Sequence, residues 1–187
     1  MVTKNFIHHL MGYWYLEKNG TPGYQANITD VTGKEYIQKG WTSAQDMYYL
    51  IPGLIFGHNS SVFTELYAPS NSEAAVGIGM FLGSGGGTSA TKNDYNLNSP
   101  ISYSNTGLQY IDFTCRSYPS SDVFAIYILT VKNNSSEDIS ISESGLFIQT
   151  GHCDKLLCLK FMIVHETFDP VILHSGETRV FTINLEV

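Results

Sequence analysis

The sequence predicts a mainly β protein: an antiparallel β-sandwich or jelly-roll with a short helical segment at the N-terminus. In roughly the last hundred residues, apolar runs rich in β-branched and aromatic residues recur about every 8 to 15 residues. Polar turn sequences separate these runs, and almost no helical period accompanies them. A length of 187 residues is enough for one ordinary domain with a sizeable apolar core.

The first part of the chain carries a different pattern. Apolar residues in 4–18 recur at the spacing of one helical face, and Gly20 follows where a helix C-cap glycine would stand. Residues 30–40 have the short alternations and glycines of a loop or hairpin, and residues 43–49 allow a short second helix. We therefore divide the chain into a helix and loop-rich segment, residues 1–74, and a β-sandwich core, residues 75–187; the two can form one compact domain.

The glycine-rich middle predicts a strand followed by a loop. Residues 74–83 form a strand-like run, and the Ser/Gly/Thr sequence at 84–89 is too flexible for a regular element. A phosphate-binding loop is disfavoured because neither a Walker lysine nor a helical pattern follows the glycines.

The last third predicts the sheets. The run at 123–132 is apolar at nearly every position, as in a strand covered on both faces, and a polar turn at 133–136 leads into an alternating run at 138–148. We expect these two strands to pair as a hairpin. Residues 156–165 and 170–173 predict two further strands, and the period of two from Val180 to Val187 predicts the last one.

The charge pattern excludes several partners. Charged residues are only 14% of the chain, the net charge is -7, and the basic residues are scattered. This disfavours nucleic acid and anionic membranes. No apolar run is long enough to span a bilayer, and the N-terminus lacks the pattern of a signal peptide, so we expect a protein that is made without conventional secretion.

Metal ligands and cofactors are not predicted. The nearest set is His152, Cys153, Cys158 and His165, but its spacing is poor and a small thiol in an apolar strand is ordinarily a core residue. Adjacent residues such as His8 and His9 point about 100° apart on a helix and do not easily share one ion. We predict that the protein needs no metal.

No catalytic residues are predicted either. The chain has no nucleophile elbow. Carboxylates could work as the acid and base of a glycosidase, although few carboxylates in a sandwich do so; the candidates are Glu137, Asp138, Glu143, Glu166 and Asp169. The sequence therefore favours a protein that is not an enzyme.

Aromatic residues are unusually frequent. The chain has 12 Tyr and 2 Trp, most of them before residue 120. These side chains combine a large contact area with a polar group, which suits protein interfaces and stacking on sugar rings, and they equally suit packing of the N-terminal half against the sandwich. The interface candidates are Tyr13, Trp14, Trp41, Tyr48 and Tyr49.

Three blocks of sequence resemble a known family. The first is Val76-Gly77-Ile78-Gly79, a Gly/Ser/Thr loop and then Asn93-Asp94-Tyr95-Asn96-Leu97, similar to a "VGxG, Gly/Thr-rich, D-x-x-L" block. The second is residues 128–147, similar to a strand, an Asn/Ser turn and an "(E/D)-I-x-I-x-E-x-G-L-(F/Y)" sequence. The third is residues 161–187, similar to a closing "P-V-x-L-x-x-G-E-T" block.

In this order the blocks resemble a family of virion proteins of tailed bacteriophages and prophages. The resemblance covers about residues 75–187. Two features depart from it: His165 stands where the family often has Arg, and the loop after Gly83 is longer than usual. The glycine of E-x-G-L suits a bend or a close approach of backbones, and Glu143 can accept backbone donors there.

The resemblance implies a non-enzymatic structural component of a virion, in the tail, a fibre adaptor or a head-attached position. It would be made in the cytoplasm of the host bacterium and would contact further copies of itself and other virion proteins, with residues 1–74 as a virus-specific attachment segment. A host-surface glycan is a further partner to consider. Two other classes stay open: a carbohydrate-binding β-sandwich module and a glycan hydrolase.

Overall fold

The computed structural model describes residues 1–8, 25–39, 77–117, 123–150 and 159–186. These residues form eight strands, and the protein is mainly β, as the sequence predicts. The strands are β1 (Gln25–Thr29), β2 (Glu35–Lys39), β3 (Gly77–Gly83), β4 (Leu108–Ser117), β5 (Val123–Asn133), β6 (Ile139–Thr150), β7 (Leu159–Leu173) and β8 (Thr178–Glu186).

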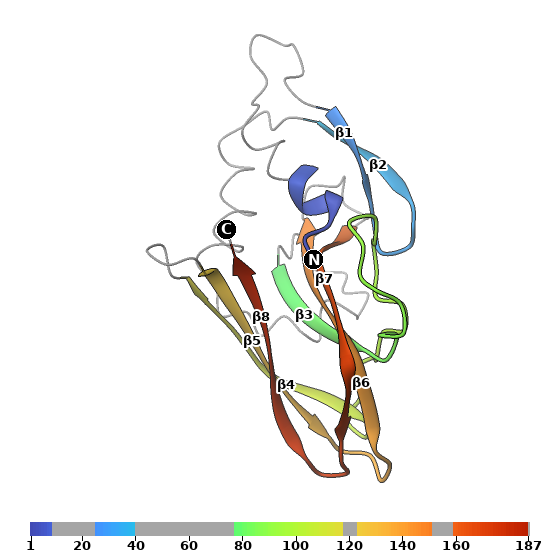
Figure 1. Ribbon diagram of the computed structural model, residues 1–187, viewed down its shortest axis with the longest axis vertical. Coiled ribbons are helices and arrows are strands. Elements are labelled where there is room, and N and C mark those ends of the chain that lie inside the picture. The colour runs from blue at the N-terminus through green and yellow to red at the C-terminus, as the bar shows by residue number, and fades with distance from the viewer. Residues whose placement is uncertain (9–24, 40–76, 118–122, 151–158, 187) are drawn as a thin grey trace.

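All the strand pairs are antiparallel and fall into three groups. The strand order is β3-β6-β7 in one sheet and β4-β5-β8 in another, while β1 and β2 form a hairpin. In Figure 1 the β1–β2 hairpin lies at the opposite end of the molecule from the β7–β8 turn.

Residues 133–136 form the expected turn, but the hairpin predicted across it is wrong. β5 pairs with β4 and β8, whereas β6 pairs with β3 and β7, so the turn carries the chain from one sheet to the other. The side chain of Asn133 stabilises the turn at which the chain passes from one sheet to the other. Its Nδ2 donates to the carbonyls of Glu137 and of Leu173 in β7, and its Oδ1 accepts from the amide and hydroxyl of Ser135. Strand pattern alone does not determine which neighbour a strand pairs with.

The prediction that the strand at 123–132 is covered on both faces is wrong for one face. Tyr127, Leu129 and Val131 are fully buried, but the alternate residues Ile126, Ile128 and Thr130 are only half-buried. β5 is the central strand of its sheet, and its outer side chains gain partial cover from β4 and β8 on either side.

The runs predicted as separate strands at 156–165 and 170–173 lie largely within one strand, β7, of 15 residues. Pro170 falls where the register with β6 shifts between the Ile141–Val171 and Glu143–Thr167 pairs. A proline, which has no amide hydrogen, is tolerated at such a bulge. The alternation predicted for the last strand is confirmed: Ile183 and Leu185 are buried.

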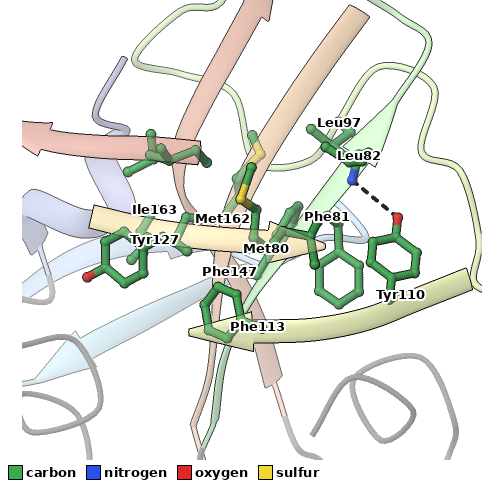
Figure 2. Close-up of a cluster of buried hydrophobic side chains, with 14 of the residues drawn as sticks. Met80, Phe81, Leu82, Leu97, Tyr110, Phe113, Tyr127, Phe147, Met162 and Ile163 are labelled. Atoms are coloured by element: carbon green, nitrogen blue, oxygen red, sulfur yellow. Dashed lines mark hydrogen bonds between the residues drawn. The ribbon is translucent and has the colours of Figure 1, made fainter. Parts of the chain in front are cut away.

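One apolar core joins the two three-stranded sheets. Phe81 of β3 packs edge-on against Tyr110 of β4, with ring centroids 5.6 Å apart, and Phe168 of β7 contacts Phe181 of β8. The Tyr110 hydroxyl accepts a hydrogen bond from the amide of Leu82 at 3.2 Å (Figure 2). The same hydroxyl donates to the carbonyl of Ile101, so this buried polar group is satisfied.

The first residues belong to this core. Val2 forms an antiparallel bridge with Val164, and the fully buried Thr3 donates its hydroxyl to the carbonyl of Met162. Residues 4–8 are helical; the rest of the helix expected over 4–18, the second helix at 43–49 and the boundary at residue 74 lie outside the described residues. Among the residues that are described, no helix is long and apolar enough to cross a membrane.

The loop or hairpin expected at 30–40 is a hairpin. Gly33, in the turn between β1 and β2, has a φ of +84°, a conformation that favours glycine. The strand and loop predicted from the glycine-rich middle are also present, as β3 and the irregular segment that follows it.

Candidate functional site

The long connection from β3 to β4 folds back on itself over β6. Ser84 donates its amide to the carbonyl of Ser99, Ile101 donates to Leu82, and Gly83 bridges Pro100. The two arms of this loop therefore pair with each other at its base, and a side chain from β6 lies between them.

That side chain is Glu143, which has no exposed surface. Its Oε1 accepts hydrogen bonds from the amides of Gly85 at 2.9 Å and Ser99 at 2.7 Å, and its Oε2 accepts from the amide of Asn98 at 2.9 Å. The sequence-based expectation that Glu143 accepts backbone donors is confirmed. A buried carboxylate needs such donors because burial without them is costly.

Asp94 lies at the end of a tight turn in the same loop. Its carboxylate accepts the Thr91 amide at 2.7 Å and the Thr91 hydroxyl at 2.6 Å. Partial burial alone would raise the pKa of Asp94, but the hydrogen bonds from Thr91 and from His165, together with the charge of His165, outweigh it and lower the pKa. Asp94 is therefore ionised near neutral pH.

His165, fully buried on β7, joins these two carboxylates. Its Nδ1 lies 2.6 Å from Oδ2 of Asp94, and its Nε2 lies 3.0 Å from Oε2 of Glu143. Both ring nitrogens of His165 thus face a carboxyl oxygen, and each nitrogen can donate a hydrogen bond when it carries a hydrogen. We call this arrangement the Asp94–His165–Glu143 triad.

The geometry of the triad suits structural support. Catalysis by an Asp–His pair requires a nucleophile or substrate at the second ring nitrogen, and here Glu143 occupies that position with both its oxygens already bonded. The two carboxylates lie on opposite nitrogens of one ring, so they do not converge on a single ion. Since Glu143 lies on β6, His165 on β7 and Asp94 in the long loop, the contacts of the triad link these three segments. The side chains of His165 and Glu143 are fully buried.

Close packing around Gly145 supports the same junction. A Cβ at Gly145 would lie 2.7 Å from a ring carbon of Phe147, 2.9 Å from Leu97 and 3.1 Å from the sulfur of Met162. Glycine is required there because the loop residue Leu97 approaches the β6 backbone closely. The glycine of E-x-G-L therefore marks a close approach, but of side chains to the β6 backbone and not of two backbones as expected.

A polar cavity of about 510 Å³ lies beside the triad, with Asp94 in its wall. One wall is the helical turn at 4–8, the second is the β1–β2 hairpin, and the third is the loop segment 92–95. Burial, and then the charge of Lys4, lowers the pKa of His8 in this wall, so its imidazole is neutral at pH 7.

Most of the other candidates from sequence lie elsewhere or outside the described residues. The interface candidates Tyr13, Trp14, Trp41, Tyr48 and Tyr49, and also His9, His152, Cys153 and Cys158, are outside them. In the part of the chain that is described, no group of three His, Cys, Asp or Glu residues could hold a metal ion.

The candidate carboxylates do not converge on one site. Asp138 is exposed and lies 3.0 Å from Nδ1 of His174, while Glu143 is buried in the triad. Glu137 and Asp169 are exposed, and Glu166 is half-buried at the register position of Ser144.

Sequence reasoning missed Asp94 as the partner of His165. One local signal was available: Thr91 and Asp94 stand three residues apart in a loop, a spacing typical of a side-chain-capped turn that fixes a carboxylate. A histidine inside the apolar run of β7 was the second signal, since a buried histidine requires polar partners.

Comparison of the chain with protein-family models, with curated proteins and with solved structures finds no match.

Proposed function

We propose that the protein is a non-enzymatic structural component of a bacteriophage virion, in the tail, a fibre adaptor or a head-attached position. We also propose that its two three-stranded sheets form a β-sandwich of the kind expected for such a component. A carbohydrate-binding module and a glycan hydrolase remain the alternatives.

The main support for this proposal is that residues from the three sequence blocks that resemble the virion family contact one another in the structure. Asp94 comes from the D-x-x-L block, Glu143 from the E-x-G-L block and His165 from the closing block, and His165 is hydrogen-bonded to both carboxyl groups. Leu97 and Gly145, of the first two blocks, also pack closely. Asp94 and Glu143 belong to the resembling blocks and meet at one buried junction, although His165, which joins them, departs from the family pattern; this meeting supports a common fold for this chain and that family.

The outer face of the β4-β5-β8 sheet supports assembly. Val180 of β8 is 55% exposed and lies across from Thr130, and the next row along the sheet is Thr114, Ile128 and Thr182. This surface is rich in β-branched side chains, with the exposed charged residues Asp112 beside Thr130 and Arg116 beside Ile126. Such a surface suits contact with a second copy of the chain, because repeated contacts in a particle do not depend on exposed ion pairs.

Light scattering on the full-length protein tests this assembly. We expect a concentration-dependent oligomer that the substitution Val180→Lys weakens. Ile172→Lys is the matched control, since Ile172 is also exposed, at 42%, but lies on β7 of the other sheet beside the exposed Ser140. A wild-type protein that stays monomeric, or equal effects of the two substitutions, would contradict the assignment of this face.

A further inference from the structure

The cavity beside the triad is built from three separate segments that are hydrogen-bonded to one another. The Lys4 amide donates to the carbonyl of Lys92 at 2.8 Å. The Asn5 side chain exchanges two hydrogen bonds with the backbone of Thr29, at 2.7 and 2.9 Å. Asn96 donates to the carbonyl of Val31 at 3.1 Å. The walls are therefore fixed in the protein as it stands, and a ligand would not have to order them.

The charges in the cavity wall cancel. Lys4 and Lys92 carry two positive charges, and Glu35 and Asp94 carry two negative ones. Asn27 and Asn93 add amide groups that both donate and accept. A wall of this kind offers hydrogen bonds in both directions without selecting for a net charge.

Tyr95 adds an aromatic surface to this polar wall. Its side chain is 43% exposed, and it packs against the β1–β2 turn at Gly33, where an added Cβ would lie 3.3 Å from the phenol carbon Cζ. Because Gly33 has no side chain, the ring can rest on the turn and still present surface to the cavity. An ordered, partly exposed aromatic ring beside hydrogen-bonding groups suits a ligand that has an apolar face and a rim of hydroxyls.

From these features we propose that the cavity binds a small neutral saccharide, with Tyr95 against a sugar face and with Lys92, Asn93 and Asn27 hydrogen-bonded to its hydroxyls. The volume of about 510 Å³ is in the range of pockets that enclose small organic ligands. This goes beyond a structural role in a virion and does not depend on it, since a sugar can bind whether or not the protein assembles.

An NMR titration of the full-length protein with lactose, maltose and N,N′-diacetylchitobiose tests the proposal. At least one of these sugars should shift the backbone amide signals of residues 92–95 and of the β1–β2 hairpin. Tyr95→Ala should weaken that binding by roughly tenfold, the loss expected when one aromatic contact is removed. Lys92→Ala should weaken this binding as well. Lys132→Ala is the control: Lys132 lies on β5 and does not line the cavity, so its loss should leave binding unchanged.

Two parallel titrations, with galacturonate and with inorganic phosphate, separate a neutral sugar from an anion. The proposal would be overturned if either anion shifted the amide signals while none of the three neutral sugars did. It would also be overturned if wild type, Tyr95→Ala and Lys92→Ala bound the sugar with equal affinity. If Tyr95→Ala disturbs the hairpin signals before any ligand is added, Lys92→Ala and Asn93→Ala decide the question, because both side chains are exposed. Absence of shifts with every sugar would refute the saccharide site and leave the virion proposal standing.

Discussion

Nε2 of His165 lies 3.0 Å from Oε2 of Glu143, and neither side chain has any exposed surface. The pair joins two neighbouring strands, and through Nδ1 the same ring holds Asp94 in the long β3–β4 loop. A buried pair of this kind is costly to break because removal of one partner leaves the other charge uncompensated. We therefore expect the fold, and not a reaction, to depend on these residues.

Replacing Glu143 by glutamine should destabilise the protein strongly. The substitution Glu143→Gln keeps the shape but removes the charge and turns an amide group toward donors on one side. We expect a loss of about 3 to 5 kcal/mol in the free energy of unfolding, measured by urea denaturation. The exposed Glu137 provides the control, since Glu137→Gln should change stability by less than about 0.5 kcal/mol. Equal stability of the two variants would show that the triad does not support the fold.

The two substitutions His165→Ala and His165→Arg should differ. Alanine removes the ring that joins Asp94 and Glu143, whereas arginine supplies a permanent positive charge with several N–H donors. We expect His165→Arg to recover part of the stability that His165→Ala loses, in thermal melts of both variants. An arginine variant no more stable than the alanine variant would mean that the cation is not what holds the junction.

Asp94 should make stability depend on acid. Its pKa is lowered in the folded protein, so the stabilisation is fully present above the unfolded value of 3.8 and is lost as pH falls through the lower folded value. Urea denaturation between pH about 6 and about 3 should show a larger loss for wild type than for Asp94→Asn, with the two curves converging at the acid end. If the stabilities of wild type and Asp94→Asn fell in parallel with pH, Asp94 would not be a source of the acid dependence.

Gly145 should tolerate no side chain. The substitution Gly145→Ala places a methyl group within 2.7 Å of Phe147 and 2.9 Å of Leu97, and we expect overpacking to cost about 1 to 3 kcal/mol. Gly87 is the matched control, because a Cβ there meets nothing within 4 Å. Denaturation midpoints of the two alanine variants give the comparison, and a Gly145→Ala variant as stable as Gly87→Ala would contradict the close packing.

The sequence was informative about strands and less so about their partners. Alternation and apolar runs located β5, β6 and β8 because side-chain burial in a strand has a period of two. They did not reveal that the chain crosses from one sheet to the other at Asn133, since the bond from its side chain to Leu173 depends on a strand 40 residues away.

The site shows the same limit. Glu143 was recognised as an acceptor because a local motif, E-x-G-L, carries that information. Its bond to His165 and the bond from His165 to Asp94 span 22 and 71 residues, so no local pattern encodes them. Likewise, Thr3 and Asn5 belong to a segment assigned to attachment, yet they are buried against β7 and β1 because tertiary contacts decide their role.

The most direct test of the proposed function is electron microscopy of purified phage particles labelled with a gold-conjugated antibody against this chain. We predict gold at one fixed position of each particle, in the tail, at a fibre attachment or on the head, and none on particles treated with preimmune serum. Particles that carry no label, while the same antibody detects the protein in the lysate from which they were purified, would contradict a structural role in the virion.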